Sequence, residues 1–233
     1  MKAVFKREFN SYFDSPIGYV FIACFLVITG ISFSLYNLLA LNSDTKSLFA
    51  SVGTYLIFLI PLLTMRLFAE EKKMRTDQLL FTSPNKTSAI VLGKFLAALG
   101  VYSVGLFFTL FYIALIAIFG KLEIMVTIST YIGVLLLGGA FISIGLFISA
   151  LTESQMISAI ATYVVTTVLW GMGSFAQGVQ NPVISLLLKN LSIYENFNIF
   201  SLGVLDISTV VYYLGVIALG LFLTVKIIEK SRI

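Results

Sequence analysis

Histidine is absent from the 233-residue sequence, and cysteine and charged residues are scarce. The lack of His excludes imidazole catalysis, imidazole metal ligation and histidine proton relays. The single cysteine, Cys24, excludes an internal disulfide and a cysteine metal cluster, and we expect it to be a buried packing residue. Only 11% of the residues are charged and 59% are apolar, whereas soluble domains carry about 25% charged residues. The composition therefore excludes an ordinary soluble domain, and it also excludes a disordered chain, which needs many charges.

Six long uncharged intervals separate the charged residues. An apolar helix of about 20 residues crosses the ~30 Å hydrocarbon core of a membrane. The sequence lacks the alternating polar and apolar strands that are typical of an outer-membrane barrel, and its first apolar run is too long for a cleaved signal peptide. We therefore predict an all-α integral membrane protein with one transmembrane domain over residues 1–233. Its six transmembrane helices are predicted at residues 17–41, 52–69, 89–119, 125–150, 156–177 and 207–226.

The basic residues indicate the orientation of these helices. With the N-terminus in the cytoplasm, all of them fall on the inner side except Lys46, Lys121 and Lys189. The positive-inside rule therefore predicts that both termini are cytoplasmic. The net charge of +4 is explained by this topology and by contact with anionic membrane lipids, because no aromatic and basic surface points to nucleic acid.

Residues 1–15 predict an amphipathic helix that lies on the inner membrane surface. Aromatic residues recur at i, i+4, i+7 and i+8, and charged residues take the other side. The sequence Asp14-Ser15-Pro16 ends this helix, because proline disfavours a helical residue before it and suits the first turn of the next helix. The alternative is a charged segment ahead of a signal anchor. The aromatic residues are Phe5, Phe9, Tyr12 and Phe13, and the charged residues are Lys2, Lys6, Arg7 and Glu8.

The densest run of charge follows the second predicted span. It predicts a short cytoplasmic helix over residues 70–84, supported by Glu71 and Arg75 at i, i+4 and stopped by the sequence from Thr82 to Asn85. Apolar residues among these charges, such as Met74 and Leu79, form the kind of surface on which another protein docks. The alternative is that the charges only face water and lipid headgroups.

Two further connections between spans carry predictions. The inner connection from Thr152 to Gln155 is very short. The outer connection over 183–205 is too short for another full crossing, so we predict two short interfacial or re-entrant helices there, with a structured outer loop as the alternative. In the fourth span, Gly139 with Ser143 and Gly145 with Ser149 have the spacing that lets helices approach closely in lipid.

The spans lack the residues of common membrane chemistries. No ionisable residue lies at the centre of a span, where ion-coupled carriers place one; Arg66, Lys94 and Asp206 lie near span ends, where snorkelling or capping explains them. The sequence around Gly93-Lys94 does not match a phosphate-binding loop, because Ser88 stands where that motif needs Gly. We therefore predict no catalytic, cofactor-binding or metal-binding residues, and a subunit that a partner drives.

Several stretches resemble the ABC-2 family of ABC-transporter permeases, and within it the gliding-motility-associated subfamily. The central matches are Leu62–Lys72, Gln78–Pro84 and Ile90–Phe95. Supporting matches near the two ends are Lys6–Ile17, Gly203–Asp206, Val211–Tyr213 and Leu223–Val225. The resemblance therefore covers essentially the whole chain.

The resemblance implies the architecture of a type V exporter. Such a permease pairs with a second copy or a paralogue, and with two ATP-binding subunits that hold ATP and Mg; the permease itself needs no cofactor and is not an enzyme. An extracytoplasmic accessory protein is a further partner, and the location is the cytoplasmic membrane of a prokaryote. The outer segment 183–205 would form a re-entrant helical hairpin between spans five and six.

The resemblance also assigns roles to residues. The helix over 70–84 would be the coupling helix that docks on the ATPase, the 152–155 connection would be a second cytoplasmic contact, and the helix over 1–15 would lie along the interface. The coupling residues are Glu70, Glu71, Lys72, Lys73, Met74, Arg75, Asp77 and Leu79; the second contact is Thr152, Glu153, Ser154 and Gln155.

The function that we expect is therefore that of a permease subunit of an ABC exporter, which couples ATP hydrolysis by a separate subunit to substrate movement or to force transmission. One alternative is a self-sufficient carrier or channel, which would show flux without nucleotide. A second alternative is a membrane scaffold that binds partners without affecting an ATPase.

Overall fold

The computed structural model describes residues 2–42, 45–75, 86–120 and 122–231, and every regular element within these ranges is a helix. Six long apolar helices within these ranges are α2 (Pro16–Phe33), α3 (Thr45–Thr64), α6 (Thr87–Phe119), α7 (Ile124–Leu151), α8 (Gln155–Gln177) and α11 (Ile207–Ser231). The remaining elements are α1 (Lys2–Asp14), the π-helical η1 (Ser34–Leu38), α4 (Ala69–Lys73), α9 (Pro182–Leu191) and α10 (Ile193–Ser201).

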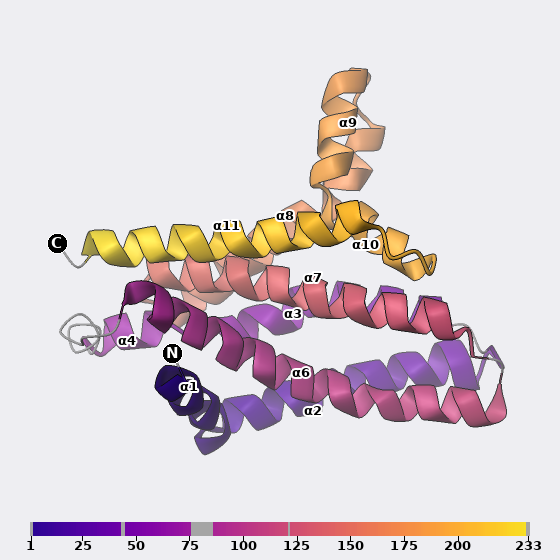
Figure 1. The fold of residues 1–233 in the computed structure, drawn as a ribbon, viewed down its shortest axis with the longest axis horizontal. Helices are drawn as coiled ribbons and strands as arrows, with labels where there is room; N and C mark the ends of the chain where they lie inside the picture. Colours follow the sequence, from indigo (N-terminus) through magenta and orange to yellow (C-terminus); the bar gives the residue numbers. More distant parts are fainter. Residues whose placement is uncertain (1, 43–44, 76–85, 121, 232–233) are drawn as a thin grey trace.

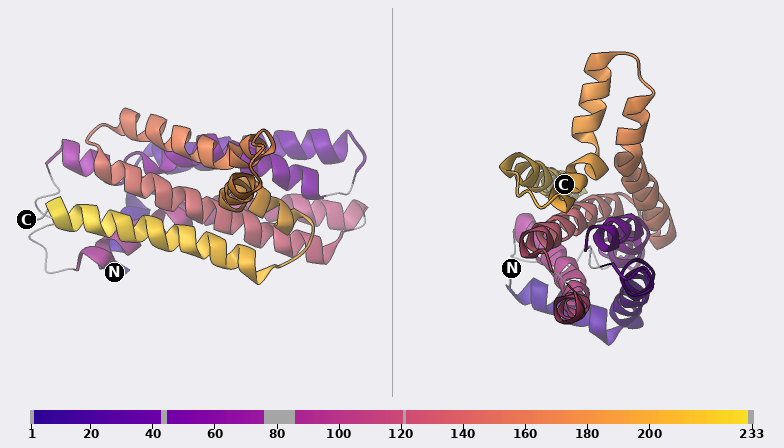
Figure 2. Two further views of the ribbon diagram at one scale, coloured as in Figure 1. Left: turned by 90° about the horizontal axis from the view of Figure 1, so that it is seen from above. Right: turned by 90° about the vertical axis from the view of Figure 1, so that its right-hand side faces the viewer.

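The described residues contain six helices that are long and apolar enough to cross a membrane, which confirms the predicted number of spans. These helices run side by side along the long axis of the molecule, and both chain ends lie toward the same end of the bundle (Figures 1 and 2). The six are Pro16–Leu38, Leu48–Lys73, Thr87–Phe119, Ile124–Leu151, Gln155–Gln177 and Ile207–Lys230.

Helix α7 lies at the centre of the bundle. It packs against α3, α6, α8, α10 and α11, and 72% of its most apolar window is buried, compared with 22% for α8 and for α11. Small residues allow this close packing. A Cβ on Gly138 would meet the ring of Tyr102, and a Cβ on Gly145 would meet the side chain of Thr64.

The segment between α8 and α11 forms the two short helices α9 and α10, which occupy different environments. Helix α9 has no buried residue, and with the end of α8 it projects from the side of the bundle (Figures 1 and 2). Helix α10 buries Phe197 and Phe200, and the Tyr213 hydroxyl of α11 donates a hydrogen bond to the Ile193 carbonyl oxygen at 2.8 Å. A re-entrant position for this segment stays a prediction.

The expectation for Cys24 is wrong. The residue was predicted to be buried packing, but it lies exposed on the surface of the bundle. Its neighbour Phe25 takes the inward position instead, with 1% of its surface exposed, and packs edge-on against the Tyr102 ring. The uniform hydrophobicity of α2 gave no indication of which side faces inward.

Candidate functional site

The candidate site lies at the end of the bundle that carries α1, α4 and the last turn of α11, which we call the terminal end. Here α3 stops at Thr64, a turn follows at residues 65–68, and α4 begins at Ala69. The Ser149 hydroxyl of α7 accepts hydrogen bonds from the backbone nitrogens of Phe68 and Ala69, at 3.0 and 3.1 Å, and donates one to the Met65 carbonyl oxygen at 3.3 Å. Since buried backbone groups at a helix break need partners, Ser149 fixes where α4 starts.

The charged residues of α4 contact other parts of this chain. Glu70 forms an ion pair with Arg66 at 3.4 Å, and the Lys72 ammonium donates a hydrogen bond to the Ala150 carbonyl oxygen. Glu71 points toward the centre of the site, where its Oε1 lies 2.8 Å from Lys94 Nζ. Three residues that were predicted to dock on a partner therefore have partners within the chain.

The helix predicted over 70–84 does not run unbroken. Helix α4 ends at Lys73, Met74 caps it, and Arg75 has a positive φ of 54°, which a long side chain rarely adopts. No Glu71–Arg75 ion pair occurs among the described residues, because Glu71 faces Lys94. Residues 76–84, including Asp77 and Leu79, lie outside the described residues.

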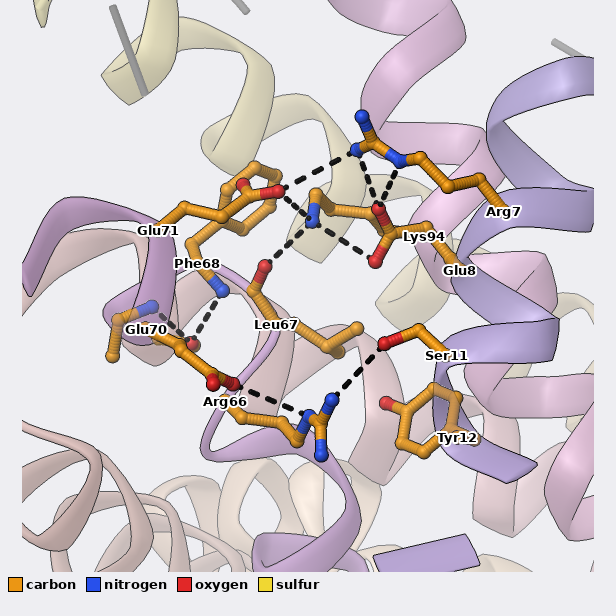
Figure 3. A network of polar contacts seen from close by, with 12 residues as sticks. Arg7, Glu8, Ser11, Tyr12, Arg66, Leu67, Phe68, Glu70, Glu71 and Lys94 are labelled. Atoms are coloured by element: carbon orange, nitrogen blue, oxygen red, sulfur yellow. Dashed lines mark hydrogen bonds and ion pairs between the residues drawn. The ribbon is translucent and has the colours of Figure 1, made fainter. Parts of the chain in front are cut away.

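Lys94 is the centre of a buried polar network (Figure 3). Only 1% of its side chain is exposed, and its ammonium contacts Glu71 Oε1 and the Leu67 carbonyl oxygen at 2.8 Å and Glu8 Oε2 at 3.1 Å. The ammonium also lies 5.0 Å from the centroid of the Phe68 ring. The predicted snorkelling or capping role for Lys94 is wrong, because its three acceptors match the three protons of an ammonium inside the protein.

Glu8 reaches this network from α1. Its Oε1 accepts a hydrogen bond from Arg7 at 2.6 Å, and Arg7 also lies 3.6 Å from Glu71 Oε1. Burial by itself would raise the pKa of Glu8, but the charge of Lys94 and the hydrogen bonds from Arg7 and Lys94 outweigh it, so the pKa is lowered from 4.5. The prediction that Glu8 lies on the water-facing side of the helix is therefore wrong.

A second group of contacts joins α1 to the turn after α3. The Tyr12 side chain is buried and its hydroxyl donates a hydrogen bond to the Leu63 carbonyl oxygen at 2.8 Å. Arg66 donates hydrogen bonds to the hydroxyls of Ser11 at 3.1 Å and Ser15 at 2.8 Å. The guanidinium of Arg66 also lies 5.6 Å from the Tyr12 ring centroid. Tyr12 therefore packs under the end of α3 instead of facing lipid.

The other aromatic residues of α1 form a row along the helix. The Phe5 and Phe9 ring centroids are 5.6 Å apart, those of Phe9 and Phe13 are 5.1 Å apart, and Phe5 and Phe9 lie against Gly100 of α6. Helix α1 is therefore attached to α6 by apolar packing as well as by the ion pair between Glu8 and Lys94.

A pocket of about 290 Å³ opens between α1, α4 and α6. Its walls include both cations and both carboxylates of the Lys94 network, together with Tyr12 and Met74. In the described ranges, this pocket included, no group of three or more His, Cys, Asp or Glu residues is placed to hold a metal ion.

The connection from Thr152 to Gln155 lies beside α4. Helix α4 contacts both α7 and α8, and the bond from Lys72 to Ala150 attaches it to the end of α7. The Ser154 hydroxyl accepts a hydrogen bond from the backbone nitrogen of Ile157 and caps α8, while Glu153 is exposed. The structure therefore brings the two predicted cytoplasmic contacts together at one end of the bundle.

Sequence reasoning missed Glu8 and Lys94 as partners. Lys94 lies about two helical turns inside α6, which begins at Thr87, so it cannot be an end-capping residue. The span predicted over 89–119 already placed Lys94 inside the helix. The identity of the two carboxylates was not predicted, because they lie 86 and 23 residues away.

Comparison with known proteins agrees with the arrangement of helices. The sequence model of a family described as ABC-2 family transporter protein matches residues 27–182, which is more than half of the chain. The matched region extends from α2 to the start of α9 and contains α4, Lys94 and the 152–155 connection. The match is to the family as a whole and gives no support to the gliding-motility subfamily. A search of curated proteins found no match.

Proposed function

The chain belongs to the ABC-2 family of transporter proteins, and we propose that a separate ATP-binding subunit docks on its terminal end and drives it. As a family member with six apolar helices, it is a multi-pass membrane protein and a permease component of a transporter. This proposal keeps the predicted coupling segment, but it assigns the contact with the ATPase to the residues of that segment that are exposed.

The attachment of α4 is the observation that carries this proposal. Its backbone is held by Ser149 of α7, and its side chains are held by Lys94 of α6 and by the end of α7. The end of the segment exposes Lys73, Met74 and Arg75, and Met74 is 68% exposed. A short element that is firmly attached to the bundle and has an exposed end is suited to transmit the movement of a docked partner.

The docking surface that we propose consists of Lys73, Met74 and Arg75 with Glu153 of the neighbouring connection. An exposed apolar side chain among charges is a common anchor in protein interfaces, and the charges favour the correct orientation of the partner. Glu70, Glu71 and Lys72 are not part of this surface, because their side chains make contacts within the chain. Asp77 and Leu79 remain proposed contacts on the strength of the sequence alone.

The remaining features of the transporter are proposed from the sequence. The distribution of basic residues supports a cytoplasmic location for the terminal end, in the cytoplasmic membrane of a prokaryote. The family resemblance supports two ATPase subunits that bind ATP and Mg, a second permease copy or paralogue, an outer accessory protein and the direction of export. The gliding-motility subfamily stays a prediction from sequence resemblance.

The test is to purify the chain from its native membrane in mild detergent, identify co-purifying proteins by mass spectrometry, and assay ATP hydrolysis. We expect a stoichiometric ATPase, and we expect Arg75→Glu combined with Glu153→Lys to weaken its binding by about tenfold or more. The control is Lys189→Glu, an exposed charge reversal on α9. Unchanged ATPase binding in the double variant would exclude this docking surface.

Two other results would replace the proposal. A chain that purifies alone and supports nucleotide-independent flux in vesicles would be a self-sufficient carrier or channel. A chain that binds an ATPase without changing its hydrolysis rate would be a scaffold.

A further inference from the structure

We propose that Lys94 is a positioning residue that joins α1, α4 and α6 into one mechanical unit, through which movement of a docked ATPase reaches the membrane helices. The inference rests on the proposed function and extends it, because it names the residue through which α4 acts and adds α1 to the moving part.

The first argument is that the contacts of Lys94 come from three separate elements. Lys94 belongs to α6, its acceptor Glu71 belongs to α4, and its acceptor Glu8 belongs to α1. The Leu67 carbonyl oxygen, from the turn between α3 and α4, is the remaining acceptor. Any movement of α4 away from α6 or of α6 away from α1 must therefore break a contact of the same ammonium.

The second argument is burial. With 1% of its side chain exposed, Lys94 is almost fully shielded from solvent, and Glu8 and Glu71 are only 13% and 20% exposed. A buried charge that loses its partner is strongly destabilised. The three elements therefore move together more readily than they separate.

The third argument is that apolar packing supports the same joint. A Cβ on Gly93, the residue before Lys94, would lie 2.8 Å from a methyl group of Val4 on α1. Arg66 ties the turn before α4 to Ser11 and Ser15 at the other end of α1. Helix α1 is therefore fastened at both ends, and the ion pairs at Lys94 connect it to α4.

An exposed ion pair at the same end of the bundle provides a matched control. Lys226 lies 3.3 Å from Glu229 on α11, with 61% and 48% of their side chains exposed, and both residues belong to one helix. Lys226→Met removes the same chemical group as Lys94→Met, but the ion pair that it removes lies within one helix and does not join two helices.

The experiment compares Lys94→Met with the triple variant Lys94→Met, Glu8→Gln and Glu71→Gln. Removing one member of a buried network leaves the others without a partner, whereas neutralising all three leaves no buried charge unpaired. Arg7, which loses Glu8 and Glu71, is 58% exposed and can be solvated by water. The single variant is expected to lower the unfolding temperature, and the triple variant to recover much of it. If Lys94 serves only stability, the triple variant also recovers the effect of the permease on ATP hydrolysis. If Lys94 transmits movement between the three helices, the triple variant does not recover this effect.

The functional readout is the ATPase that co-purifies with the full chain, reconstituted in lipid vesicles. We expect the triple variant to bind this ATPase as the wild type does, but to reduce the effect of the permease on the hydrolysis rate by about fivefold or more. Lys226→Met should leave binding and rate unchanged. A triple variant with a normal hydrolysis rate would overturn the inference, whereas a wild-type chain that binds no ATPase would overturn the proposed function itself.

A distance measurement tests the joint without an ATPase. Spin labels at Lys6→Cys on α1 and Lys73→Cys on α4, with Cys24→Ser to remove the native thiol, report the distance between the two elements in the full chain in nanodiscs. We expect a narrow distribution that broadens in the triple variant and not in Lys226→Met. A distribution that stays equally narrow without the Lys94 network would contradict the inference.

Discussion

The Ser149 hydroxyl accepts a hydrogen bond from the backbone nitrogen of Phe68 at 3.0 Å, across a sequence separation of 81 residues. The contact joins the central helix α7 to the break between α3 and α4. The same hydroxyl also accepts a hydrogen bond from the Ala69 nitrogen and donates one to the Met65 carbonyl oxygen. One small side chain therefore provides partners for buried backbone groups that the helix break leaves without them.

Replacing this hydroxyl should therefore destabilise the protein. Ser149→Ala leaves two buried N–H groups without their partner, and we expect a loss of about 1–3 kcal/mol in the free energy of unfolding. Ser103→Ala is the control, since its hydroxyl bonds only to the Leu99 carbonyl oxygen one turn earlier in the same helix. Thermal unfolding in detergent measures both variants, and equal losses would show that Ser149 has no special role at the break.

Protonation of Glu8 should weaken the attachment of α1 in acid. Its pKa is lowered in the folded protein, so its ionised form stabilises the fold fully above the ordinary value of 4.5, and this contribution is lost as the pH falls through the lower, folded-state value. The difference in unfolding temperature between the wild type and Glu8→Gln should therefore be constant from neutral pH down to about 4.5 and shrink below it. A difference that already shrinks between pH 7 and 5 would be inconsistent with a lowered pKa.

Adding a methyl group at the contact between α6 and α7 should destabilise the folded protein. A Cβ on Gly138 would lie 2.2 Å from the ring of Tyr102, whose hydroxyl is held by the Val134 carbonyl oxygen at 2.8 Å. Gly138→Ala forces the two helices apart, and we expect a destabilisation of about 1–3 kcal/mol. Gly215→Ala on α11 is the matched control, because its Cβ would meet no atom within 4 Å. Similar unfolding temperatures for the two variants would contradict this packing.

The orientation of the chain can be tested with single cysteines. In a Cys24→Ser background, a membrane-impermeant maleimide should label Lys189→Cys in intact cells, and it should label Lys73→Cys only after the membrane is opened. The reason is the positive-inside rule, which places the terminal end in the cytoplasm and the α9 region outside. Labelling of Lys73→Cys in intact cells would reverse the proposed topology, and with it the side on which an ATPase docks.

The sequence by itself determined the number of spans. This number follows from a local property: an uncharged apolar interval of sufficient length forms a helix that crosses the membrane. The break after Thr64 was not predicted, because it lies inside the span expected over 52–69. The two short helices between α8 and α11 and the amphipathic character of residues 1–15 were likewise predicted from local patterns.

Only the tertiary structure decided which charges face inward. Glu71 and Arg75 have the spacing of a helical ion pair, but α4 ends before Arg75 and the rotation of α4 turns Glu71 toward Lys94. The surroundings of Glu8 and of Cys24 likewise depend on how α1 and α2 rotate against α6. A helical pattern specifies which residues share a face, but which face is buried depends on the shape and charge of distant neighbours, and these meet only when the bundle packs.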